Sequence, residues 1–142
     1  MKKAWNLLPA LIAAAFVVGI FGAQAVQAQS KKQYVPKAKV TSLVKIPLAG
    51  VKGKDVIIKR FEFPSNFVGG KHWHPGPVFV YVLEGELTVK TDQGVQTVKA
   101  GEVYVETPRI AMRIKNLSAT GALKIVVFQI GDADKPMMIK AK

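Results

Sequence analysis

The succession of short apolar segments after residue 29 constrains the fold of this chain most. Most of these segments alternate or are continuously apolar, residues 40–47 are mixed, and each segment is followed by a turn or loop. In the segment 110–115, Ile110, Met112 and Ile114 share one face and the basic residues between them share the other, as side chains do along a β-strand. No long 3.6-residue period occurs after residue 29, so helices are expected to be absent or short. We therefore predict an all-β sandwich or barrel, with strands over residues 40–47, 55–63, 78–83, 87–89, 95–99, 103–106, 110–115 and 122–130.

The first 28 residues are typical of a secretory signal peptide. Lys2 and Lys3 precede an apolar stretch over about residues 7–22, and small residues follow up to Ala28. We expect cleavage after Ala28, with Ala25 as the alternative site, and a periplasmic or secreted mature protein. The competing interpretation is an uncleaved membrane anchor. Because the chain has no cysteine, a lipid-modified cysteine and a disulfide framework are both excluded.

Length and charge limit the possible domain organisation and partners of the mature chain. Removal of residues 1–28 leaves a chain long enough for one domain, and it lowers the formal charge from +12 to +10 because Lys2 and Lys3 are lost. We expect a flexible basic lead-in over residues 29–39, a β-domain over 40–132 and a basic C-terminal tail over 133–142. Nucleic acid is not an expected partner, since no recognition helix or interleaving of aromatic and basic residues occurs. No membrane span is expected once the signal peptide is cleaved.

Both histidines of the chain, His72 and His74, lie two positions apart just before an apolar segment. In an extended segment such residues point to the same side, with Cα atoms roughly 6.5 to 7 Å apart. Two imidazoles in this arrangement can converge on one metal ion. The plain alternative is that they pack or form hydrogen bonds as structural residues.

The stretch around the histidines resembles the first motif of the cupins. The resemblance rests on His72, His74, the Pro-Gly pair that follows, and the apolar strand that ends in Val-Leu-Glu-Gly-Glu at residues 82–86. The stretch from Gly101 through Pro108, followed by Asn116, is similar to the second motif of the cupins. The resemblance implies an antiparallel jelly-roll β-barrel with a metal pocket inside, and pairing of two barrels as a homodimer.

The chain departs from the cupin pattern at two ligand positions. Val78 stands where many cupins carry a metal-binding glutamate, and Met112 stands where the third histidine is usual. Three interpretations follow. His72, His74 and the Met112 thioether would form a soft set that favours copper, whereas Glu106 with the two histidines would suit Fe(II) or Mn. In the third interpretation no metal binds and the pocket is apolar. The direction in which Glu106 faces depends on a strand register that the sequence does not fix.

Cupins include oxygenases, isomerases, decarboxylases and non-enzymatic binders, so the resemblance does not define a reaction. The first hypothesis is an exported cupin with one transition-metal ion (Cu, Fe or Mn) held by His72, His74 and Met112 or Glu106. If it is an enzyme, it would be a metal-dependent oxygenase or isomerase acting on a small organic molecule. The second hypothesis is a non-catalytic module that holds a small ligand or a copper ion. No catalytic residue is assigned.

Overall fold

The computed structural model of the protein describes residues 38–142, and these consist of β-strands, turns and loops. The predicted signal peptide and nearly all of the predicted lead-in lie outside the described residues. No helix that is both long and apolar enough to cross a membrane occurs within residues 38–142. The strands are β1 (Lys39–Pro47), β2 (Lys54–Phe63), β3 (Phe67–Val68), β4 (His72–Trp73), β5 (Val78–Glu84), β6 (Glu86–Thr91), β7 (Gly94–Lys99), β8 (Val103–Glu106), β9 (Met112–Asn116), β10 (Leu123–Asp132) and β11 (Ile139–Lys140).

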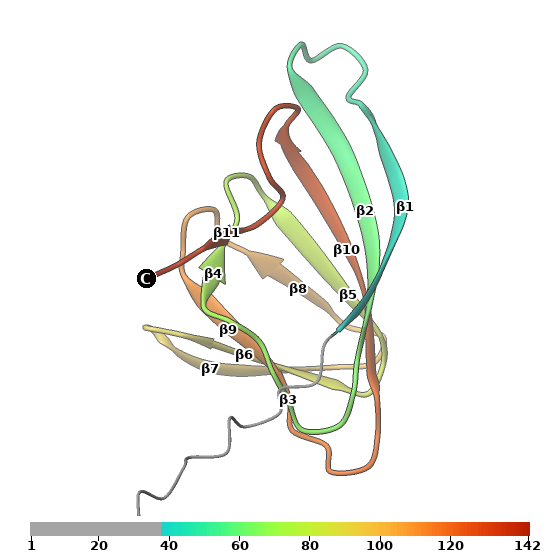
Figure 1. The fold of residues 1–142 in the computed structure, drawn as a ribbon, viewed down its shortest axis with the longest axis vertical. Helices are drawn as coiled ribbons and strands as arrows, with labels where there is room; N and C mark the ends of the chain where they lie inside the picture. Colours follow the sequence, from blue (N-terminus) through green and yellow to red (C-terminus); the bar gives the residue numbers. More distant parts are fainter. Residues whose placement is uncertain (1–37) are drawn as a thin grey trace, which may run out of the picture. The chain divides into compact units, whose positions relative to one another are not determined.

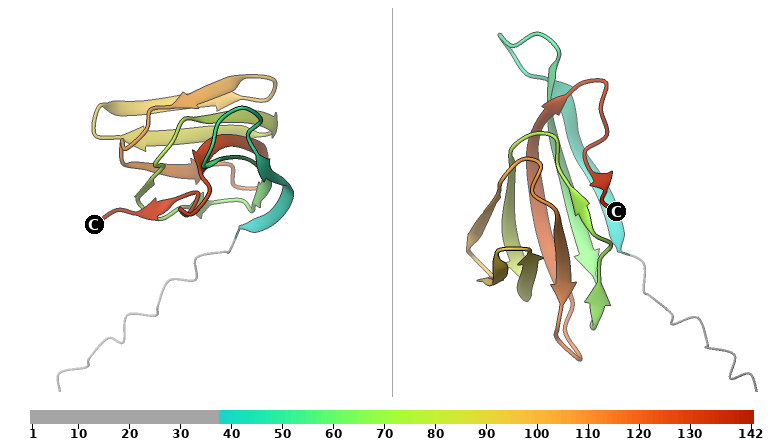
Figure 2. Two further views of the ribbon diagram at one scale, coloured as in Figure 1. Left: turned by 90° about the horizontal axis from the view of Figure 1, so that it is seen from above. Right: turned by 90° about the vertical axis from the view of Figure 1, so that its left-hand side faces the viewer.

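The strands form two antiparallel sheets. One has the order β1-β2-β10-β5-β8, and the other has the order β11-β4-β9-β6-β7 with β3 paired to β9. The chain passes repeatedly from one sheet to the other, and the two sheets face each other in Figures 1 and 2. This arrangement is an antiparallel jelly-roll barrel, so the predicted all-β barrel fold is confirmed.

Alternation along the central strands builds the barrel interior. Every second residue of β10 from Leu123 to Gly131 is buried, and Val78, Val80 and Val82 of β5 are buried in the same way. These inward side chains pack with buried residues of the opposite sheet, including Leu87 and Val89 of β6, in one hydrophobic core. The apolar runs 78–83 and 122–130 therefore predicted the two strands, and the structure shows which of their residues face inward.

The last ten residues, predicted as a basic tail, contain ordered structure. Met137 is buried in the hydrophobic core. After it, Ile139 and Lys140 form β11, which pairs antiparallel with Trp73 and His72 of β4. Figure 1 shows β11 beside β4, so the C-terminal segment lies along the short strand that begins at His72.

The link between β4 and β5 passes so close to β10 that only glycine fits. A Cβ atom at Gly76 would overlap the backbone carbonyl oxygen of Ile130. We expect Gly76→Ala to reduce the free energy of unfolding by about 3 kcal/mol, because backbone atoms on both sides must shift. Urea unfolding measures this effect. Gly70→Ala is the matched control, since a Cβ there would meet open space, and an equal loss in both variants would contradict the explanation.

Candidate functional site

The two histidines face the same side of the chain. Their rings are 5.2 Å apart between centroids and nearly perpendicular, and both line one pocket in the barrel. His74 is almost completely buried, whereas His72 is half-buried. The backbone N–H of Arg109 donates to the carbonyl oxygen of His74 at 2.9 Å, which ties the segment after β4 to the loop after β8.

Backbone carbonyls fix the orientation of both imidazoles. Nδ1 of His72 lies 2.9 Å from the carbonyl oxygen of Gly70, and Nδ1 of His74 lies 2.7 Å from that of Met137. Because a carbonyl oxygen can only accept, each Nδ1 carries the proton and each neutral ring keeps a lone pair on Nε2. Such hydrogen bonds orient histidines that bind metals through the other nitrogen.

Glu106 of β8 points into the barrel beside His74. Its backbone is the register partner of Val78, so the carboxylate enters from the strand next to the position where the cupin resemblance leads one to expect a glutamate. Oε2 of Glu106 lies 3.1 Å from Nε2 of His74, yet this oxygen is buried and has no hydrogen-bond partner within residues 38–142. The two atoms are therefore in contact without the alignment of a hydrogen bond.

Burial favours the neutral forms of both Glu106 and His74. Burial raises the pKa of the Glu106 carboxyl from 4.5 to about 7. Burial also lowers the pKa of the His74 imidazole; the nearby His72 lowers it further, while contacts with the Met137 carbonyl and the Gln129 side chain oppose the change. Near neutral pH, burial therefore disfavours the state in which Glu106 and His74 are both ionised.

The pocket that contains these three side chains, the histidine pocket, has mostly apolar walls. It has a volume of about 430 Å³, within the range of sites for small organic ligands. Its walls include three phenylalanines, of which Phe61 stacks on Phe63 at 5.8 Å and Phe63 contacts Phe67 at 4.7 Å. Lys71 and Lys140 also line it. The arrangement can hold a small apolar molecule next to the two imidazoles and the carboxylate.

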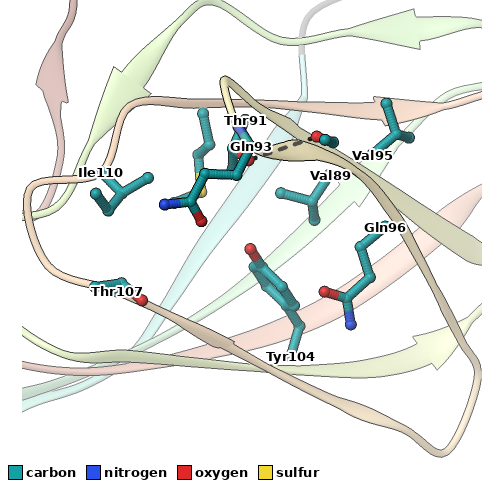
Figure 3. Close-up of a pocket in the computed structure, with 10 residues that line it drawn as sticks. Val89, Thr91, Gln93, Val95, Gln96, Tyr104, Thr107 and Ile110 are labelled. Carbon is teal, nitrogen blue, oxygen red and sulfur yellow. Dashed lines mark hydrogen bonds between the residues drawn. The ribbon is translucent and has the colours of Figure 1, made fainter.

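Met112 is fully buried in the core and is the register partner of His72, but it does not line the histidine pocket. It lines a second, polar pocket of about 340 Å³ with Tyr104 of β8. Figure 3 shows Tyr104 among Gln93, Gln96 and Thr107 around this pocket. The structure thus brings His72, His74 and Glu106 together, while Met112 contributes to a different cavity.

Sequence reasoning missed two contributors to the site. One is the backbone carbonyl of Met137, which no side-chain pattern could indicate. The other is Gln129 of β10, which is completely buried with neither polar atom of its amide hydrogen-bonded within residues 38–142. Its signal was present in the sequence, since Gln129 is the one polar side chain in the inward series of the most apolar strand.

Among residues 38–142, no three His, Cys, Asp or Glu side chains form a ready cluster of metal ligands. The chemistry of the donors nonetheless fits a divalent transition-metal ion. Both imidazoles keep a lone pair on Nε2, and Glu106 has a buried oxygen that no hydrogen bond satisfies. Two nitrogens and one carboxylate oxygen are a known ligand set for Fe(II) and similar ions.

The fold and the pocket define a small antiparallel β-barrel with a binding site in its interior. A sequence model of the family described as Cupin domain matches residues 59–128. This chain belongs to the cupin superfamily, and its barrel is a cupin domain of the type-2 class. The predicted family is therefore confirmed.

Solved structures with the same fold share little sequence with this chain. A cupin 2 domain-containing protein from Halorhodospira halophila has 20% identity and a TM-score of 0.60, over 74% of this chain and 70% of that chain. A cupin domain from Bordetella pertussis has 22% identity and a TM-score of 0.55, over 68% of this chain and 96% of that chain. The DMSP lyase DddQ from Ruegeria pomeroyi has 13% identity and a TM-score of 0.59, over 73% of this chain and 51% of that chain. Comparison with curated proteins gave no match. At these identities the similarity shows the fold and not the activity.

Proposed function

We propose that this cupin binds one divalent transition-metal ion through Nε2 of His72, Nε2 of His74 and the carboxylate of Glu106, beside a pocket for a small organic molecule. The observation that carries the proposal is the buried Glu106 Oε2, which has no hydrogen-bond partner within the described residues and lies 3.1 Å from His74 Nε2. Two ligand atoms of one ion, each about 2.1 Å from it, are about 3 Å apart when they are adjacent in its coordination shell. A single ion would therefore satisfy both atoms.

The ligand set favours Fe(II) or Mn over copper. Two imidazoles and a carboxylate suit these harder ions, whereas copper would gain from the Met112 thioether. Met112 lines the polar pocket with Tyr104, so copper binding by His72, His74 and Met112 stays a prediction apart from this proposal. When bound, the ion would polarise an oxygen of the substrate as a Lewis acid.

The residues of this chain would supply binding and proton chemistry around the ion. The apolar walls around Phe61 and Phe63 would hold the body of a small organic molecule and exclude water. Glu106, whose pKa is about 7 without the ion, must lose its proton to bind the ion, so metal binding would release a proton near neutral pH. These roles are compatible with an oxygenase or isomerase.

The alternative is a non-catalytic binding module without a metal. The direct contact between His74 Nε2 and Glu106 Oε2 favours it, because a single proton between these atoms would also satisfy them. In that case the histidine pocket would hold only an apolar ligand.

Two further parts of the proposal concern the assembly and its location. A homodimer is supported by apolar side chains on the outer face of β5 and β8, where Phe79, Tyr81, Val103 and Val105 are exposed. A periplasmic or secreted location is supported by the sequence of residues 1–28.

Metal retention tests the proposed function directly. Purified protein is loaded in turn with Cu, Fe, Mn, Ni and Zn, with Fe(II) handled without oxygen, then desalted and measured by elemental analysis. We expect one equivalent of Fe or Mn at pH 7.5. Retention should fall as the pH drops through about 6, because the imidazoles must be neutral to bind.

A protein that keeps none of the five metals at stoichiometric level would refute the metal proposal and leave the binding module. Retention that does not depend on pH would contradict binding through histidine. The His72→Ala, His74→Ala double variant lacks both proposed nitrogen ligands and serves as the matched blank.

A further inference from the structure

Two side chains near the proposed metal site are buried with polar atoms that lack hydrogen bonds. Within residues 38–142 the buried side-chain atoms without a partner belong to Arg60, Glu106 and Gln129. Arg60 is explained by its ion pair with Glu62, whose oxygen is 3.4 Å from its Nε. Glu106 Oε2 contacts His74 Nε2 at 3.1 Å, but that nitrogen carries no proton in the neutral ring whose Nδ1 donates to the Met137 carbonyl. Gln129 is uncharged and has no ion pair that could replace a hydrogen bond. Buried polar atoms are almost always paired, so an unpaired set points to a partner such as an ion or a water molecule.

The two unexplained side chains lie in one row across the sheet. Gln129 of β10 is the register partner of Val78 of β5, and Val78 is the register partner of Glu106 of β8. All three side chains are buried and point into the barrel. Adjacent strands are about 4.8 Å apart, so the amide and the carboxylate enter the interior from either side of Val78, which has no polar atom of its own.

His74 links the two ends of this row. Its Nε2 contacts Glu106 Oε2 at 3.1 Å, and its ring is also close enough to Gln129 for the amide to act on its charge. Nevertheless neither Nε2 nor Oε1 of Gln129 forms a hydrogen bond within the described residues. His74 therefore lies next to two buried oxygens without a hydrogen bond, that of Glu106 in the histidine pocket and that of Gln129, which is not part of the pocket lining.

We propose that the side-chain oxygen of Gln129 is a further ligand of the metal ion bound by His74 and Glu106. The inference rests on the proposed function and adds a residue from the last long strand to the ligand set. A carboxamide oxygen is a hard, neutral donor that suits Mn and Fe(II). Its addition would satisfy the side-chain oxygens of Gln129 and Glu106 with one ion.

Gln129→Leu separates this role from a structural one, because the two roles predict opposite results. As a ligand, Gln129 contributes to metal affinity but weakens the metal-free fold, since its amide is buried unpaired. We expect the Leu variant to bind Mn(II) about 10- to 100-fold more weakly, while the melting temperature of the metal-free protein stays equal or rises. Calorimetric titration and the EPR spectrum of bound Mn(II) provide the readouts. Gln96→Leu, at an exposed glutamine of β7, is the matched control and should change neither quantity.

The outcomes distinguish this inference from the proposed function. If the wild-type protein binds no Mn(II) or Fe(II), the proposed function fails and the inference fails with it. If the wild type binds metal and Gln129→Leu binds it equally well, the inference alone is overturned. A metal-free Leu variant that melts much lower with unchanged metal affinity would identify Gln129 as structural.

A second variant decides the question if Gln129→Leu does not fold. Gln129→Glu keeps the shape and replaces a neutral oxygen ligand with a charged one. We expect it to retain Mn(II) with tighter binding and an altered EPR spectrum. An affinity and spectrum identical to those of the wild type would show that residue 129 does not contact the ion.

Discussion

His72→Ala and His74→Ala, made separately, are each expected to weaken Mn(II) or Fe(II) binding by about 100-fold or more, because each removes one of the proposed nitrogen ligands. The two variants should differ in stability. His74 is buried and donates to the Met137 carbonyl, so its removal leaves a cavity and an unpaired carbonyl, and should cost about 2 kcal/mol in the metal-free protein. His72 is half-buried, so its removal should cost less than about 1 kcal/mol.

Titration calorimetry and urea unfolding of metal-free protein measure the two quantities independently. Trp73→Phe is the matched control, because Trp73 lies between the two histidines but does not line their pocket. It should leave metal affinity unchanged. Metal binding that survives both alanine substitutions at full strength would remove the basis of the proposed site, whatever the stability results.

The direction of Glu106 shows where sequence reasoning reaches its limit. Within residues 103–106 the valines share one face, and Tyr104 and Glu106 share the other. Hydrophobicity alone would turn the valines inward. The structure has the reverse: Val103 and Val105 are 57% and 56% exposed, whereas Glu106 is 4% exposed. The pairing of β8 with β5, a strand distant in sequence, determines which face of β8 turns inward. Alternation within one strand does not show which of its faces that is.

Two segments with long apolar runs were predictable for the opposite reason. In β5 and β10 the inward positions are apolar except for Gln129 and Gly131, so pattern and environment agree and the strands follow from the sequence. The C-terminal segment was missed because its lysines have the composition of a solvated tail. Its contribution to the site is a backbone carbonyl of Met137 and a short pairing of β11 with β4, neither of which depends on a recognisable side-chain pattern.

Glu106→Gln is expected to stabilise the metal-free protein by up to about 3 kcal/mol at pH 8 and to change its stability little at pH 4. The pKa of Glu106 rises from 4.5 to about 7 on burial, a change of roughly 2.5 units at 1.36 kcal/mol each. Because the folded state holds this proton more tightly than the unfolded state, the wild-type protein loses stability as the pH rises from about 4.5 to 7, and the loss is complete above that range. Glutamine cannot ionise, so the variant lacks this loss.

Urea unfolding with a chelator present, at intervals from pH 4 to pH 8, measures the difference between the two proteins. His74 is present in both. Its lowered pKa removes stability as the pH falls below 6.5, which is the opposite direction, so the difference curve reports mainly on Glu106. Glu86→Gln, at the exposed start of β6, is the control and should give a flat difference. A flat curve for Glu106→Gln as well would mean that its carboxylate is already compensated in the metal-free protein, and the buried, unpaired oxygen that supports the metal site would lose its significance.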